Sequence, residues 1–128
     1  MQHFLSRFPI LRTLGLGALL VSFLASSSLA QDLDSPRVAK AKDRQCEIEV
    51  RGKDSSFLVS AFGLVPEETL EITSESAGEV IRYLANAGSS GEYHFIEIPL
   101  VKGRHSGIAR ITVSASRCRL NVSFPWRE

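Results

Sequence analysis

From Cys46 onward, apolar and polar residues alternate in short runs separated by turn-forming residues. Alternation with a period of two places the apolar side chains on one face of a β-strand. Seven such runs follow one another, at residues 46–50, 55–62, 69–73, 79–85, 92–98, 108–115 and 118–124. Gly63, Pro99 and the segment 86–91 interrupt the pattern between runs. No run has the periodicity of an amphipathic helix, so the sequence predicts an all-β fold. We expect a single seven-stranded antiparallel sandwich at residues 46–128, with a small closed barrel as the alternative.

The two cysteines add a constraint on topology. Cys46 begins the first predicted strand and Cys118 begins the last, each on the apolar face of its strand. An even number of cysteines in a small exported chain is most simply explained by one disulfide bond. A bond between these two would tie the ends of the sandwich together and contribute about 4 kcal/mol by restricting the unfolded chain. A free redox or catalytic thiol is the alternative, but the chain has no Cys-x-x-Cys pair.

Residues 1–30 have the pattern of a secretory signal peptide. Two arginines precede an apolar run at residues 13–24, and small residues follow it. This arrangement predicts cleavage between Ala30 and Gln31. An uncleaved anchor is the alternative, but the apolar run is shorter than the roughly 20 residues that cross a bilayer. We therefore expect a periplasmic or secreted protein with no stable membrane span after cleavage.

Residues 31–45 are polar and charged, with Leu33 and Val38 as the only sizeable apolar residues. This composition predicts a flexible leader in front of the sandwich. The full chain has 15 basic and 14 acidic residues, and cleavage would remove Arg7 and Arg12, which leaves a net charge of about −1. Nucleic-acid binding requires several basic residues on one face, so we expect no nucleic-acid partner.

One stretch carries a resemblance to a known class of modules. It begins with a Gly-Leu-x-Pro-x-Glu turn at residues 63–68, continues through an alternating strand and a glycine turn, and ends with Gly-x-Ala-x-Ile-x-Val at residues 107–113. In strand and turn order, residues 58–113 resemble the bacterial immunoglobulin-like sandwich modules of exported proteins. The resemblance implies a module for adhesion, assembly or accessory binding, without family-wide catalytic residues. The two cysteines and the ending at residues 124–126 are not part of that general pattern.

The segment VKGRHSGI, residues 101–108, is a candidate for partner contact. Lys102, Arg104 and His105 lie, together with Gly103, Ser106 and Gly107, between two apolar runs. A phosphate-binding loop normally adds a helix N-terminus or a nest of consecutive amides, and neither is predicted here. The sequence therefore favours a solvated loop between two strands. If the protein binds an acidic partner, these three residues are the first candidates for mutation.

Trp126 is the second candidate for partner contact. It lies between Pro125 and Arg127, beyond the last predicted strand. An exposed Trp beside Arg is a composition favoured at binding hot spots. The alternative, which the sequence favours, is that Trp126 folds back to cover the open end of the core.

Catalysis and metal binding find little support in the sequence. His94 lies in a predicted strand and His105 in a loop, and neither is near a serine nucleophile motif of the Gly-x-Ser-x-Gly type. Catalytic zinc usually has three protein ligands, and no spacing of this chain suggests such a set. We therefore expect no catalytic residues, no metal and no cofactor.

Three functional hypotheses remain from the sequence. The first is a small exported sandwich that binds an unknown protein or polymer of the cell envelope and is not an enzyme. The second is an assembly subunit completed by a strand from a neighbour, a mode that needs an alternating apolar donor segment. Residues 31–45 do not supply one. The third is a small hydrolase, which would require a histidine with a carboxylate and a serine in a pocket.

Overall fold

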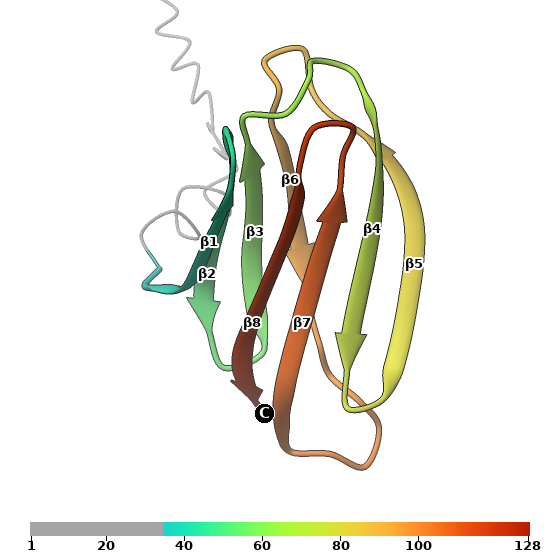
Figure 1. The fold of residues 1–128 in the computed structure, drawn as a ribbon. Coiled ribbons are helices and arrows are strands. Elements are labelled where there is room, and N and C mark those ends of the chain that lie inside the picture. The colour runs from blue at the N-terminus through green and yellow to red at the C-terminus, as the bar shows by residue number, and fades with distance from the viewer. Residues whose placement is uncertain (1–34) are drawn as a thin grey trace, which may run out of the picture.

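The computed structural model describes residues 35–128 and contains eight β-strands in this range, with no helix (Figure 1). The signal peptide at residues 1–30 and the cleavage site between Ala30 and Gln31 lie outside the described residues. The strands are β1 (Arg37–Asp43), β2 (Cys46–Lys53), β3 (Ser56–Phe62), β4 (Thr69–Ser76), β5 (Glu79–Asn86), β6 (Tyr93–Glu97), β7 (Ser106–Ser114) and β8 (Arg119–Arg127). The described part of the chain therefore offers no long apolar helix that could cross a membrane.

The strands form two four-stranded antiparallel sheets. Sheet A has the order β1-β2-β3-β6 and sheet B has the order β5-β4-β7-β8. Inward-facing side chains of both sheets form one buried core, in which the rings of Phe57 on β3 and Phe124 on β8 lie 4.7 Å apart. Along β2 and β8 every second residue is buried, as period-two alternation requires. The all-β sandwich expected from the sequence is confirmed.

The prediction of seven strands and a flexible leader was wrong in one respect, because residues 37–43 form β1. This strand pairs antiparallel with β2, with Ala41 opposite Ile48 and Lys42 opposite Glu47. Its inward-facing residues include Ala39 and Ala41, whose small side chains give a weak hydrophobic pattern. Pairing with β2 supplies backbone hydrogen bonds that a hydropathy pattern does not reveal. The sandwich therefore begins at β1, ahead of Cys46.

One side of the sandwich is closed by covalent and hydrogen bonds. The Cys46–Cys118 disulfide joins the start of β2 to the residue before β8, as expected from the sequence. Next to it, the backbone N–H of Arg119 donates to the carboxylate of Asp43 at 2.8 Å. At the other end of β8, the backbone N–H of Arg127 donates to the carbonyl of Asp54 at 2.9 Å. Sheets A and B are thus fastened together along β8.

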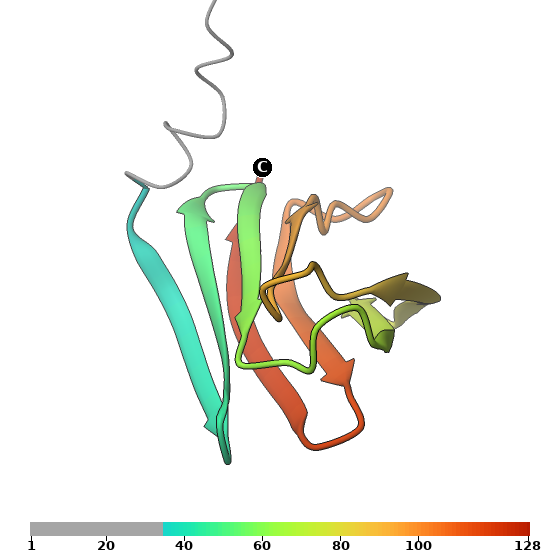
Figure 2. The same ribbon diagram turned by 90° about the horizontal axis from the view of Figure 1, so that it is seen from above.

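The opposite side of the sandwich is open. It is formed by β6, the edge of sheet A, and β5, the edge of sheet B. Seen from above, β5 extends beyond β6, so the two sheets are offset (Figure 2). The rings of Tyr83 on β5 and Phe95 on β6 meet edge to face at 6.4 Å and are only half-buried. Burial, together with the neighbouring Tyr93 and Glu97, raises the pKa of Tyr83 to about 12, so its hydroxyl is protonated at neutral pH.

Candidate functional site

The outer face of sheet B carries a regular array of polar side chains. Residues paired across the four strands form three rows, which the antiparallel register fixes: Leu84, Glu71, Ser114 and Arg119; Arg82, Thr73, Thr112 and Asn121; Val80, Glu75, Arg110 and Ser123. Alternation places these residues outward because their neighbours Ile72, Ile111 and Val122 face the core. We call the nine residues of this array that line its cavity the polar face: Glu71, Thr73, Glu75, Arg82, Arg110, Thr112, Ser114, Arg119 and Asn121.

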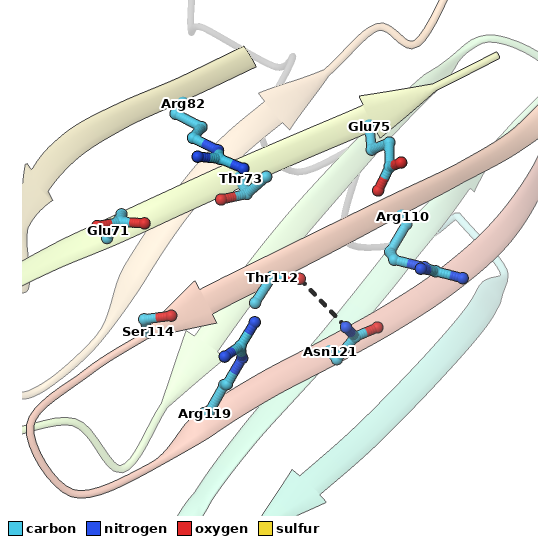
Figure 3. Close-up of a pocket in the computed structure, with 9 residues that line it drawn as sticks. All are labelled: Glu71, Thr73, Glu75, Arg82, Arg110, Thr112, Ser114, Arg119 and Asn121. Atoms are coloured by element: carbon cyan, nitrogen blue, oxygen red, sulfur yellow. Dashed lines mark hydrogen bonds between the residues drawn. The ribbon is translucent and has the colours of Figure 1, made fainter. Parts of the chain in front are cut away.

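The polar face encloses a shallow cavity of about 330 Å³ (Figure 3). At its centre, Thr112 is buried because it lies between Thr73 on β4 and Asn121 on β8. The side-chain amide of Asn121 donates to the hydroxyl of Thr112 at 3.2 Å. In the close-up, Arg82 extends toward Thr73 and Arg119 toward Thr112. Both guanidinium groups therefore border the cavity.

The charged groups of the polar face are not neutralised by one another. Within residues 35–128, its three arginines and two glutamates form no ion pair and no side-chain hydrogen bond. Glu75 and Arg110 are cross-strand partners in register, yet their charged groups are not paired. Their donors and acceptors therefore remain available to a ligand.

The outer face of sheet A shows the contrast. There, Lys40 lies 2.7 Å and Lys42 3.6 Å from the carboxylate of Glu47, and Arg51 pairs with Glu49. The hydrogen bond from Lys40 is the largest cause that lowers the pKa of Glu47. Ion pairs between β1 and β2, and one within β2, thus account for these charges of sheet A. They do not account for those of sheet B.

The chemistry of the polar face suits a ligand with hydroxyl and anionic groups. Guanidinium groups donate forked hydrogen bonds to carboxylates and phosphates, and glutamates accept hydrogen bonds from hydroxyls. None of the nine lining residues is aromatic or a histidine. The face therefore offers hydrogen bonding and charge, without a stacking surface or a general base of the histidine type.

The loop that contains Lys102, Arg104 and His105 connects β6 to β7. All three side chains are exposed, and Gly103 has a positive φ of 80° that a tight turn requires. His105 Nδ1 lies 2.6 Å from the carboxylate of Glu128, and the backbone N–H of Glu128 donates to the carbonyl of His105 at 2.8 Å. None of the three lines the cavity of the polar face. Their role in partner contact stays a prediction.

Trp126 is buried, with 3% of its surface exposed, so the prediction that it is an exposed contact residue was wrong. Its indole N–H donates to the hydroxyl of Ser76 at 2.9 Å, and Ser76 donates to the carbonyl of Pro99 at 2.8 Å. The alternative, that Trp126 covers the end of the core, is confirmed. Trp126 belongs to β8, which continues through Pro125. Pro125 can lie within this strand because β8 is at the edge of sheet B.

A Ser–His–Glu arrangement on sheet A escaped the sequence reasoning, because it is created by strand pairing. His94 Nδ1 lies 2.9 Å from the hydroxyl of Ser60, its partner across β3 and β6, and His94 Nε2 lies 3.1 Å from the carboxylate of Glu92. Ser60 is 7% exposed and sits in the middle of β3, which is paired on both sides. Its backbone N–H is therefore committed to the sheet and cannot form an oxyanion hole. The arrangement fits a side-chain hydrogen bond better than a catalytic triad.

Among residues 35–128, no group of three or more His, Cys, Asp or Glu side chains is placed to hold a metal ion.

The chain matches no protein-family model, no curated protein and no solved structure.

Proposed function

We propose that this protein is an exported, non-catalytic immunoglobulin-like module that binds an anionic, hydroxyl-rich polymer of the cell envelope. In this proposal residues 1–30 direct export and are removed after Ala30, and the mature protein is periplasmic or secreted. The disulfide is compatible with an oxidising compartment. The module needs no cofactor and has no nucleic-acid partner.

The polar face of sheet B is the observation that carries the proposal. Five charged side chains stand around a cavity without pairing, although the register brings Glu75 and Arg110 together. Arginine donors and glutamate acceptors within one shallow cavity complement a chain of sugars that carries both hydroxyls and carboxylates. Three arginines against two glutamates give the cavity a small positive charge, which favours an acidic polymer over a neutral one.

The strand order supports the immunoglobulin-like part of the proposal. Neighbours β2-β3-β6 and β4-β7-β8 correspond to the A-B-E and C-F-G neighbours of immunoglobulin domains. In this correspondence β2 takes the place of strand A. β1 is an additional strand before it, and β5 is an additional strand beside β4. The disulfide joins the start of β2 to the residue before β8 and is not the inter-sheet B–F bond of antibody domains.

Sedimentation with purified peptidoglycan tests the proposal. We expect the wild-type protein to bind, and a variant with Arg82→Ala, Arg110→Ala and Arg119→Ala to bind at least tenfold more weakly. The matched control removes three positive charges from β1 on sheet A, through Arg37→Ala, Lys40→Ala and Lys42→Ala, and should bind like the wild type. Binding to neutral dextran should be weak for all three proteins.

The polar face is excluded as the binding site if the wild type does not bind peptidoglycan, or if both triple variants lose binding to the same extent. A third variant with Lys102→Ala, Arg104→Ala and His105→Ala tests the loop between β6 and β7 in the same assay. Unchanged binding of this variant would remove the loop as a contact surface for the polymer.

A further inference from the structure

The offset between the sheets leaves the inner side of β5 uncovered. On β4 the inward-facing residues are buried, with Ile72 at 0% and Ser74 at 6% exposed. Their partners on β5, in the same inward orientation, are half-buried Tyr83 and Ile81, which is 62% exposed. Sheet A thus covers β4 and ends before it covers β5. The inward side of β5 is an apolar surface that faces solvent.

A second group of apolar residues extends this surface. Ile98 and Leu100, which follow β6, are 60% and 44% exposed. Together with Ile81 they line a small hollow of about 40 Å³ that also contains Ser76 and Glu97. Contiguous exposed apolar surface of this kind marks an interaction site more often than a free surface.

One additional strand in sheet A would be enough to cover the inner side of β5. Neighbouring strands lie about 4.8 Å apart, so a fifth strand of sheet A, added beside β6, would lie over the inner side of β5. Figures 1 and 2 both show β5 projecting past β6 on this side. β6 is the last strand of sheet A, and within the described chain its outer backbone groups have no strand partner. Its pairing with β3 has no bulge, and the strand contains neither Pro nor Lys, which are among the usual protections of an edge.

We propose that the free edge of β6 accepts an extended segment of a partner protein as a fifth strand of sheet A. The added strand places alternate apolar side chains against Ile81, Tyr83 and Phe95. Glu79 and Glu97 border the same surface, and one oxygen of Glu97 accepts a hydrogen bond from Ser74 at 2.6 Å. These carboxylates favour a partner segment with a basic residue at that end.

Both ends of the described chain lie on the side of the sandwich away from β6. β1, the first described strand, lies at the opposite edge of sheet A, and the C-terminus follows β8 at the opposite edge of sheet B (Figure 1). A second copy is disfavoured by shape. If two β6 strands paired about a twofold axis, each copy's projecting β5 would occupy the space of the other. A single extended peptide can lie beside β6 and against the inner side of β5, because it brings no second sheet that would clash with β5.

A displayed library of nine-residue peptides with alternating apolar and polar positions tests the proposal on the full-length protein. We expect selected peptides to slow hydrogen exchange of the β6 amides at least tenfold. Ile81→Lys puts a charge under the added strand and should weaken binding at least tenfold. Leu84→Lys, on the outer face of the same strand and 71% exposed, is the matched control and should bind like the wild type.

The proposal is overturned if no peptide is selected, if Ile81→Lys and Leu84→Lys bind equally, or if protection appears on another strand. Protection of β6 that rises with protein concentration in the absence of peptide would also overturn it, in favour of a second copy. Protection of β6 without peptide that is lost when the residues before β1 are removed would also overturn the proposal. In that case the chain's own N-terminal segment would be the added strand. Binding of peptidoglycan is measured independently, because the polar face lies on the other side of sheet B.

Discussion

Glu68 joins two loops that are far apart in the sequence. One carboxylate oxygen accepts the backbone N–H of Val65 at 2.6 Å, and the other accepts that of Ser116 at 2.7 Å. The first contact closes the turn between β3 and β4, and the second reaches the turn between β7 and β8. Burial alone raises the pKa of Glu68, but the two amides and Arg117 outweigh it, so the pKa is lowered from 4.5. The ionised carboxylate is therefore the form that the fold stabilises.

Replacement of Glu68 by Gln should lower the free energy of unfolding by about 1–2 kcal/mol at pH 7. The side-chain NH2 group of Gln would face one of the two backbone N–H groups, which would then lose its acceptor. The native pKa lies below the unfolded value, so the unfolded state takes up the proton first as the pH falls. The stabilisation is complete above about pH 4.5 and is lost at lower pH. Urea unfolding at pH 7 and pH 3 measures both effects.

The exposed neighbour Glu67 supplies the control for this experiment. Its side chain makes no contact of this kind, so Glu67→Gln should leave the free energy of unfolding almost unchanged. A difference between wild type and Glu68→Gln that is equally large at pH 3 would show that the two hydrogen bonds do not depend on ionisation, contrary to this account.

At the scale of strands, β7 and β8 meet through a glycine and the single tryptophan. Gly107 and Trp126 are cross-strand partners, and a Cβ atom on Gly107 would lie 2.9–3.0 Å from the indole ring. The indole is held in place by its hydrogen bond to Ser76. The absence of a side chain at position 107 therefore leaves room for the ring against β7.

We expect Gly107→Ala to lower the free energy of unfolding by about 1–3 kcal/mol, since the ring is confined and must shift. The fluorescence of Trp126 should change with it, because the sequence contains no other tryptophan. In a Trp126→Phe background the same substitution should cost less, since the smaller ring leaves room for the methyl group. Equal losses in both backgrounds, measured by circular dichroism, would show that contact with the indole is not the cause.

How far the sequence predicts each strand depends on what holds that strand in place. The strands from β2 to β8 were predicted because their inward residues are large and apolar, as at Ile48 and Phe57. β1 was missed because it is held by backbone pairing and contributes only small side chains such as Ala41 to the core. The last strand was expected to end at Pro125, but β8 continues through Trp126 because that residue packs into the core.

For the molecule as a whole, the candidate sites follow from how the strands are ordered and not from any local motif. Alternation predicts that Glu71 faces outward, but it does not tell which arginines share its face. Arg82 and Arg119 border the same cavity because β5 and β8 flank the central strands β4 and β7 of sheet B, over which the cavity lies. The pairing of Ser60 with His94 and the offset of β5 from β6 likewise depend on sheet order. The cysteine pair is the exception, because position in the first and last predicted strands already indicated a bond between the ends.

The disulfide between these two cysteines should contribute substantially to stability. Cys46 and Cys118 are 72 residues apart, so their disulfide restricts most of the unfolded chain. Chain-entropy arithmetic gives about 4 kcal/mol for a loop of this length. The double variant Cys46→Ala and Cys118→Ala should unfold in urea with a free energy lower by that amount. Its folded state should persist, because Asp43 still accepts the N–H of Arg119 beside the missing bond. Unchanged fluorescence of Trp126 before unfolding would establish this, and a loss below about 1 kcal/mol would contradict the assignment of the effect to the unfolded chain.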